Sequence, residues 1–236
     1  MQQSNTVTLL DHDVFRLFVH PGEIVEVRIM GIDGKRLVLS GYFDDHDAFC
    51  KVIHEANRRK HGGAYFTLQV IDPRLIGRAY NRIKPSDLTT SDKDVLAYRW
   101  LPIDQDPVRP AGISSSDKEL EAALELRDPV AAWLTTELGF PEPIKAMSGN
   151  GGHLLFRLPD WPVNDENKAI IKGILEDVSK RFSTDKVKID TTVFNPARIW
   201  KLYGTTARKG DPVPGNEHRE ARPHRMSYID DLGGAA

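Results

Sequence analysis

The chain has 236 residues, of which 40% are hydrophobic, so it can bury a sizeable core and disorder is not expected. Its formal net charge of −2 excludes a protein that coats nucleic acid through overall charge, and nucleic-acid binding would need a local basic patch. The single cysteine, Cys50, excludes a disulfide framework and a zinc site built from several thiolates. Because no stretch has the character of a signal peptide or a membrane span, we expect a cytoplasmic protein without a membrane partner.

The first half of the chain predicts a hairpin, a helix and two further strands. Two apolar stretches, 24–30 and 36–43, flank the turn Gly-Ile-Asp-Gly and are typical of a β-hairpin. Apolar residues between 49 and 56 recur at helical spacing, with Asp45 or Asp47 as the cap. Residues 65–71 and 96–106 predict strands, and Pro102 in the second indicates an edge or a bulge.

The second half of the chain predicts three helices and several short strands. Ser116 and Glu119 form a capping-box pattern, Asp128-Pro129 predicts a second helix that ends at Gly139, and residues 164–182 predict a third. Short strands are expected at 144–147, 153–158, 187–190, 198–203 and 224–229, and the longest loops at 110–116 and 211–220. Because helices and strands do not strictly alternate, we expect an α+β fold with a mixed or largely antiparallel sheet.

Two carboxylates lie near the end of the strand predicted at 96–106. Side chains alternate along a strand, so Asp104 and Asp106 would point to the same side. Adjacent carboxylates repel each other unless a cation lies between them, and hard oxygen ligands suit Mg²⁺ or Mn²⁺. The same pattern is also common at polar strand ends, where both side chains are simply solvated.

Two further segments carry groups that suit an anionic ligand. Residues 148–153, Ser-Gly-Asn-Gly-Gly-His, combine glycines that let backbone N–H groups approach an anion with a histidine that can donate to phosphate. Asp190 could supply a third carboxylate, and segment 197–225 contains seven Lys or Arg against three Asp or Glu. A positive segment suits a triphosphate or a nucleic-acid backbone. A flexible turn and a solvated basic face would give the same patterns.

Together these motifs are the components of two-metal nucleotidyl transfer. Their order and spacing resemble the archaeo-eukaryotic primase superfamily, and within it the primase-polymerase (prim-pol) domains of bacterial plasmids, phages and CRISPR-associated proteins. The resemblance rests on Asp104-Gln105-Asp106, on 148–153, and on Ile189-Asp190 with Arg198 and Lys201, and it extends from about residue 20 to 230.

The resemblance implies an RRM-like catalytic subdomain at about 96–230 fused to a smaller N-terminal αβ unit at about 20–95. These would form one catalytic domain, as a fragment of a longer protein. The resemblance assigns catalysis and metal binding to Asp104, Asp106 and Asp190. It assigns nucleotide binding to Ser148, Asn150, Gly152, His153, Arg198 and Lys201. Arg208, Lys209, Arg222 and Arg225 follow as candidates for contacts with phosphate, template or primer.

We therefore expect a DNA primase or DNA polymerase that adds NTPs or dNTPs on single-stranded DNA with Mg²⁺ or Mn²⁺. Its partners would be a template strand, a primer strand and, in a longer protein, a helicase or another C-terminal domain. One alternative is a non-catalytic module that binds single-stranded DNA in a replication or defence complex. Another is a metal-dependent phosphodiesterase or nicking initiator, but His218, His224 and Tyr203 do not form the His-x-His and tyrosine pattern that it would need.

Overall fold

The apolar alternation after residue 24 folds into the first of two main sheets. In the computed structural model, which describes residues 11–31 and 37–233, β1 (Val25–Met30) and β2 (Val38–Phe43) pair antiparallel as predicted. The expected turn between them lies largely outside the described residues. β3 (Gly63–Thr67) pairs with β1, and the short β5 (Lys84–Pro85) pairs with β2. The outermost strand beside β3 is β10 (Ile199–Lys201), so the order is β10-β3-β1-β2-β5.

A second sheet contains most strands of the remaining chain. Its long strand β6 (Val95–Pro107) pairs with β8 (Gly152–Pro162), β4 (Val70–Ile71) and β9 (Val187–Ile189). β7 (Ile144–Met147) and β13 (Tyr228–Asp231) extend the sheet beyond β8, and β11 (Thr206–Ala207) pairs separately with β12 (Arg225–Met226). All of these pairings are antiparallel, which confirms the expected α+β fold.

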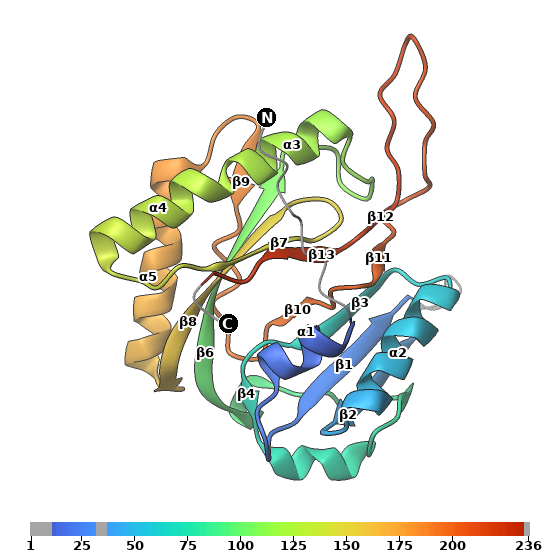
Figure 1. Ribbon diagram of the computed structural model, residues 1–236, viewed down its shortest axis with the longest axis vertical. Helices are drawn as coiled ribbons and strands as arrows, with labels where there is room; N and C mark the ends of the chain where they lie inside the picture. Colours follow the sequence, from blue (N-terminus) through green and yellow to red (C-terminus); the bar gives the residue numbers. More distant parts are fainter. Residues whose placement is uncertain (1–10, 32–36, 234–236) are drawn as a thin grey trace.

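The helices begin and end close to the residues that the sequence indicated. Asp45 caps α2 (His46–Arg58), and Ser116 forms the capping box of α3 (Asp117–Glu125). α4 (Arg127–Leu138) ends at Gly139 in a left-handed conformation, and α5 (Asp165–Phe182) follows the cap Asn164. The first helix, α1 (Asp11–Phe18), and the 3₁₀ segments η2 (Pro73–Arg78) and η3 (Asp92–Asp94) were not predicted. Figure 1 shows α1 and α2 beside the first sheet and α3, α4 and α5 around the second.

The prediction of one continuous strand at 65–71 is wrong, because this segment divides into β3 and β4, which belong to different sheets. The division occurs at Gln69, whose side chain is buried. Its Oε1 accepts the N–H groups of Arg99 and Trp100 at 2.7 and 3.0 Å, and its Nε2 donates to the carbonyl oxygen of Trp100 at 2.8 Å. The side chain therefore replaces strand pairing at the point where β6 shifts register.

Pro102 lies at a local edge of β6, one of the two situations that the sequence indicated, and the bulge lies elsewhere in the strand. The register shift of β6 lies between Tyr98 and Trp100, whereas Pro102 itself is paired with Leu155 on β8. On its other side, β4 pairs only with the start of β6 and β9 only with its end. Pro102 thus lies between these two partners, where its missing N–H removes no bond of the sheet.

One hydrophobic core joins the two sheets, and each sheet contains a strand from the other part of the chain. Phe18 from α1 contacts Phe66, Trp100 and Tyr203, with ring centroids 4.9 to 6.5 Å apart. β10 completes the N-terminal sheet, and β4 extends the second sheet. The two-subdomain division near residue 95 stays a prediction. None of the helices that the structure describes is long and apolar enough to cross a membrane.

Candidate active site

The end of β6 brings the candidate carboxylates beside each other. Asp104 is paired directly with His153 on β8, and directly paired residues project from the same face of a sheet. The backbone N–H of Asp190, just after β9, donates to the carbonyl oxygen of Asp104 at 2.9 Å. Asp106 follows two residues after Asp104, on the same side of the strand. Antiparallel register therefore gathers residues that are far apart in the sequence.

These residues line one cavity of about 460 Å³ between the two sheets. Of the predicted site residues, it is lined by Asp104, Asp106, Ser148, Asn150, His153, Asp190, Arg198, Lys201, Arg208 and Lys209. Gly152, Arg222 and Arg225 do not line it. The lining also contains residues that were not predicted, namely Met30, Gly62, Gly63, Tyr65, Val193, Ile199, Trp200 and Ala207.

Asp104 and Asp106 lie in different electrostatic environments. Burial raises the pKa of Asp104, but His153, whose Nε2 lies 3.5 Å from Oδ1, together with Lys209 and Arg198 outweighs burial, so the pKa lies below its ordinary value. Burial and then the charge of Asp104 raise the pKa of Asp106, although its side chain is 45% exposed and water screens part of this effect. Two carboxylates that repel each other favour a cation between them.

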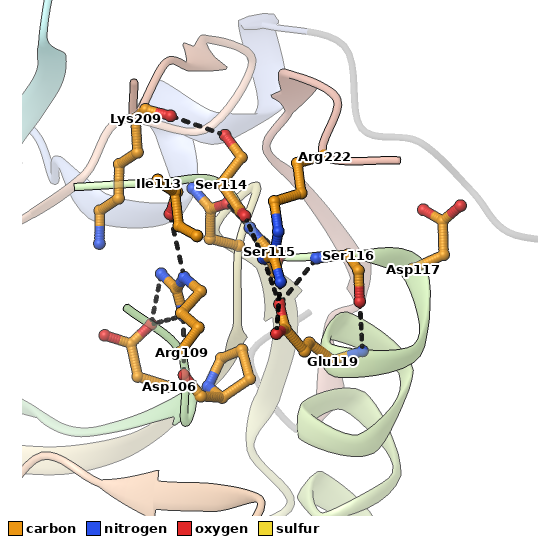
Figure 2. A network of polar contacts seen from close by, with 12 residues as sticks. Asp106, Arg109, Ile113, Ser114, Ser115, Ser116, Asp117, Glu119, Lys209 and Arg222 are labelled. Atoms are coloured by element: carbon orange, nitrogen blue, oxygen red, sulfur yellow. Dashed lines mark hydrogen bonds and ion pairs between the residues drawn. The ribbon is translucent and has the colours of Figure 1, made fainter. Parts of the chain in front are cut away.

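Arg109 is a neighbour of this pair that the sequence did not single out as a site residue. Its Nη1 lies 3.5 Å from Asp106 Oδ1, and the same atom donates to the carbonyl oxygen of Pro107 at 2.9 Å. Figure 2 shows Arg109 beside Asp106, with the side chain of Lys209 extending toward them. Two cations therefore partly balance Asp106.

Asp190 is held by its own loop. Its Oδ1 accepts the backbone N–H and the hydroxyl of Thr192 at 2.8 and 2.7 Å, and its Oδ2 lies 3.5 Å from Arg198 Nη2. Arg198 also donates to the hydroxyl of Thr192 at 2.6 Å. These contacts order the third carboxylate and one candidate phosphate-binding side chain together.

The oxygen chemistry of the three carboxylates fits Mg²⁺ or Mn²⁺. Among the described residues, however, no three His, Cys, Asp or Glu side chains converge closely enough to hold a metal ion. Each carboxylate instead has a partner from the protein, which is His153 for Asp104, Arg109 for Asp106 and Thr192 for Asp190. Joint coordination would require these side chains to rotate within the cavity.

A buried chain of hydrogen bonds orients His153. Trp200 Nε1 donates to Tyr203 Oη at 2.8 Å, and Tyr203 Oη lies 2.9 Å from His153 Nδ1. Burial raises the pKa of Tyr203, so its hydroxyl remains protonated and can donate to Nδ1. When Nδ1 accepts in this way, the ring hydrogen lies on Nε2, the nitrogen nearer to Asp104. Trp200 and Tyr203 were not predicted, because aromatic residues in an apolar stretch are typical of a core.

The glycine-rich turn is closed by its own side chains. Ser148 Oγ accepts the N–H groups of Asn150 and Gly151 at 3.3 and 2.9 Å, and Asn150 Oδ1 accepts the N–H of Ser115 at 2.8 Å. A Cβ on Gly151 would lie 2.5 Å from a backbone oxygen at the end of β6, and one on Gly152 would lie 2.8 Å from a backbone oxygen of α3. The glycines thus allow close packing, and contacts between this turn and an anion stay a prediction.

Four cationic side chains line the same cavity as the carboxylates: Arg198, Lys201, Arg208 and Lys209. Lys201 is 7% exposed, and its Nζ donates to Thr205 Oγ1 at 2.8 Å. Burial and then the charge of Arg208 lower the pKa of Lys201 to about 7. Lys201 has no carboxylate partner among the described residues, and a buried unpaired ammonium is unfavourable. A bound anionic ligand would stabilise the charged form of Lys201.

Arg222 and Arg225 are engaged outside the cavity. Arg222 forms a bidentate pair with Glu119 at 2.7 and 2.9 Å, and Arg225 Nη2 lies 2.5 Å from Asp117 Oδ1. Figure 2 shows Arg222 beside Glu119 at the start of α3. These pairs attach the base of the extended 211–220 loop, which projects from the body in Figure 1, to α3. Their predicted contact with phosphate, template or primer remains a prediction.

No family model matches this chain, and no curated protein matches it. Among solved structures, the chain is similar to the polymerase domain from Mycobacterium tuberculosis Ligase D in complex with DNA. The two are 13% identical with a TM-score of 0.43, and the comparison covers 96% of this chain and 86% of that chain. A likeness at this level assigns no activity to the chain.

Proposed function

We propose that this chain is a template-directed nucleotidyltransferase that adds NTPs or dNTPs on single-stranded DNA. The observation that supports this most is a single cavity that combines three carboxylates with four cationic side chains. Carboxylates suit a divalent cation, and the cationic side chains suit an anion. A nucleoside triphosphate with its metal ion needs both at once.

In this proposal, Asp104, Asp106 and Asp190 hold Mg²⁺ or Mn²⁺. Such ions lower the pKa of an attacking hydroxyl and neutralise a leaving pyrophosphate. His153 donates from Nε2 to a phosphate oxygen, because Tyr203 engages the opposite ring nitrogen. Arg198, Lys201, Arg208 and Lys209 bind the triphosphate, and Ser148, Asn150 and Gly152 shape the turn that borders it.

The same chemistry defines the partners that we propose. A single-stranded DNA template and the 3′ end of a primer would meet the triphosphate at the carboxylates. The motifs resemble those of the prim-pol type within the archaeo-eukaryotic primase superfamily, to which we propose that the chain belongs. A helicase or another C-terminal domain would join it in a longer protein.

The test is incorporation of labelled nucleotides on a primed single-stranded template with Mg²⁺ or Mn²⁺. We expect the primer to be extended by the nucleotide that the template specifies, and the product to follow a change of template base. The variant carrying both Asp104→Asn and Asp106→Asn serves as the inactive control. Absence of extension by folded protein with either metal and both sugar types would contradict the proposal.

One observation favours the alternative of a non-catalytic DNA-binding module, namely that each carboxylate already has a partner from the protein. Calorimetry with a nucleoside triphosphate, with and without Mg²⁺, separates the two functions. The enzyme is expected to bind the nucleotide more tightly with the metal. The binding module would bind single-stranded DNA equally well after both aspartates are replaced, and would show no metal-dependent nucleotide binding.

A further inference from the structure

A contact between distant parts of the chain positions the segment that carries Arg208, one of the four cationic side chains that line the cavity. The end of α2 and the loop that leads to β3 lie beside the segment around β11 (Figure 1). Asn57 Nδ2 donates to the carbonyl oxygen of Gly204 at 2.6 Å, and Asn57 Oδ1 accepts the N–H of Thr206 at 3.0 Å. Asn57 thus holds the backbone that leads directly into Arg208.

His61 extends this contact to the side chain of Arg208. Arg208 Nη1 lies 3.0 Å from His61 Nε2, and Arg208 Nη2 donates to the carbonyl oxygen of Asn57 at 3.3 Å. A guanidinium can only donate hydrogen bonds, so Nε2 must accept and the hydrogen of a neutral His61 must lie on Nδ1. Within the described part of the chain, Arg208 forms no ion pair with a carboxylate, in contrast to Arg222.

His61 is poorly explained by packing alone. It is 3% exposed, and its Nδ1 is buried without a hydrogen-bond partner among the described residues. An unpaired buried N–H is unfavourable, so an apolar side chain would suit a purely structural position better. Burial and then the charges of Lys201 and Arg208 lower the pKa of His61 to about 4. The ring therefore remains neutral, and able to accept from Arg208, throughout the neutral pH range.

We propose that His61 is a positioning residue that holds the guanidinium of Arg208 at the cavity wall for the triphosphate. The inference rests on the proposed function, in which Arg208 binds phosphate. His61 and Asn57 together use two of the guanidinium hydrogens, and an arginine has five N–H donors, so the others remain for a ligand. A loop of the N-terminal part that carries no predicted site residue would in this way contribute to nucleotide binding.

The first experiment replaces the acceptor in the full chain. His61→Leu removes it, and we expect the KM for the nucleotide in primer extension to rise by roughly tenfold, the effect of one hydrogen bond to a charged group. We expect kcat to change less than KM. In His61→Gln, the side-chain oxygen can still accept from Arg208, so the KM should return to within about threefold of the wild type. Thermal denaturation checks folding, and His61→Phe is a second replacement without an acceptor should His61→Leu not fold.

The second experiment is a double-mutant cycle. If His61 acts through Arg208, the variant with both His61→Leu and Arg208→Ala should have the same KM as Arg208→Ala alone. The matched control is Lys209→Ala, because Lys209 lines the same cavity and the hydrogen bond to His61 comes from Arg208 instead. In the variant with both His61→Leu and Lys209→Ala, the fold-increases in KM of the two single variants should multiply. Three outcomes would each overturn the inference. The first is an unchanged KM in His61→Leu, and the second is an equal rise of KM in His61→Leu and His61→Gln. The third is that the KM effects of His61→Leu and Arg208→Ala multiply in the double variant.

The activity of the wild-type protein distinguishes a failure of this inference from a failure of the proposed function. If the wild type extends primers, the proposed function stands and the His61 variants alone decide the inference. If it binds nucleotide without extending a primer, the dissociation constant from calorimetry replaces KM in the same cycle. A folded wild type that neither binds nor incorporates nucleotide contradicts the proposed function, and the role of His61 falls with it.

Discussion

Two titratable residues of the cavity are held in unfavourable states in the free protein. Burial and the charge of Asp104 raise the pKa of Asp106, whereas burial and the charge of Arg208 lower the pKa of Lys201 to about 7. A bound cation would stabilise the ionised carboxylate, and a bound anion would stabilise the ammonium. Opposite pKa shifts within one cavity are typical of a functional site rather than of a structural ion pair.

Replacing Asp106 by asparagine should abolish nucleotide incorporation without lowering the melting temperature. The substitution removes one of two carboxylates that repel each other in the metal-free protein, so we expect an unchanged or higher melting temperature. Scanning calorimetry without metal and primer extension with metal measure the two effects. Asp128→Asn, at an exposed aspartate paired with Lys145, is the control and should leave activity intact. A melting temperature several degrees lower for Asp106→Asn would indicate a structural role.

Replacing Lys201 by methionine should stabilise the free protein and weaken nucleotide binding. The folded pKa is about 7 and the ordinary value is 10.5. Below pH 7, Lys201 is therefore charged in both states and its burial penalty is fully present. Between pH 7 and 10.5 the unfolded chain binds more protons, so this residue makes stability rise with pH.

For Lys201→Met, we expect the free energy of unfolding to increase by about 1–3 kcal/mol at pH 6. The increase should be smaller at pH 9. Urea unfolding at both pH values measures this, with the exposed Lys180→Met as the control. An equal gain at both pH values, or a loss of stability at pH 6, would show that Lys201 is not a strained buried cation.

The turn between β7 and β8 is packed against the β11–β12 pair. Gly149 has a φ of 101°, and a Cβ there would lie 2.4 Å from the Cβ of Ala207 and 3.0 Å from the carbonyl oxygen of Arg225. The turn that precedes His153 therefore sets the position of the segment that carries Arg208. The sequence predicted the turn from its glycines but could not show what lies against them.

Replacing Gly149 by alanine should destabilise the protein by about 1–3 kcal/mol, because it combines a left-handed backbone with a steric clash. The displaced β11 segment should also raise the KM for the nucleotide. Chemical denaturation and steady-state kinetics measure these effects. Gly77→Ala is the matched control, since a Cβ at Gly77 would have no described atom within 4 Å and its φ is not positive. Equal effects of the two substitutions would contradict the packing argument.

The two sheets of the protein depend on each other. β10 belongs to the first sheet although β6, β7, β8 and β9 of the second precede it in the chain, and β4 belongs to the second although β5 of the first follows it. Trp200 in β10 and Tyr203 just after it are buried in the same core as Phe66 and Trp100. Neither part can bury its apolar surface without a segment of the other.

We therefore expect a single cooperative unfolding transition for the whole chain. A fragment that ends at residue 95 should not fold, because it lacks β10 and the aromatic side chains around it. Scanning calorimetry of the chain and circular dichroism of the fragment provide the measurements. Two separate transitions, or a folded fragment, would instead support independent subdomains.

Local features of this protein could be predicted from short stretches of the chain. Asp45 and Ser116 cap helices through hydrogen bonds that span three residues, and the two-residue alternation of a strand places Asp104 and Asp106 on one side. These interactions involve neighbours in the chain, so a short stretch of sequence contains everything that they require.

Which basic residues line the cavity depends on contacts between distant parts of the folded chain. Arg222 pairs with Glu119 across 103 residues, and Arg208 meets His61 across 147. The division of the strand at Gln69 and the place of β10 in the first sheet likewise depend on distant partners. Such contacts form because folding brings these groups together and removes them from water, so that they must find hydrogen-bond partners within the protein, a condition that local sequence patterns do not contain.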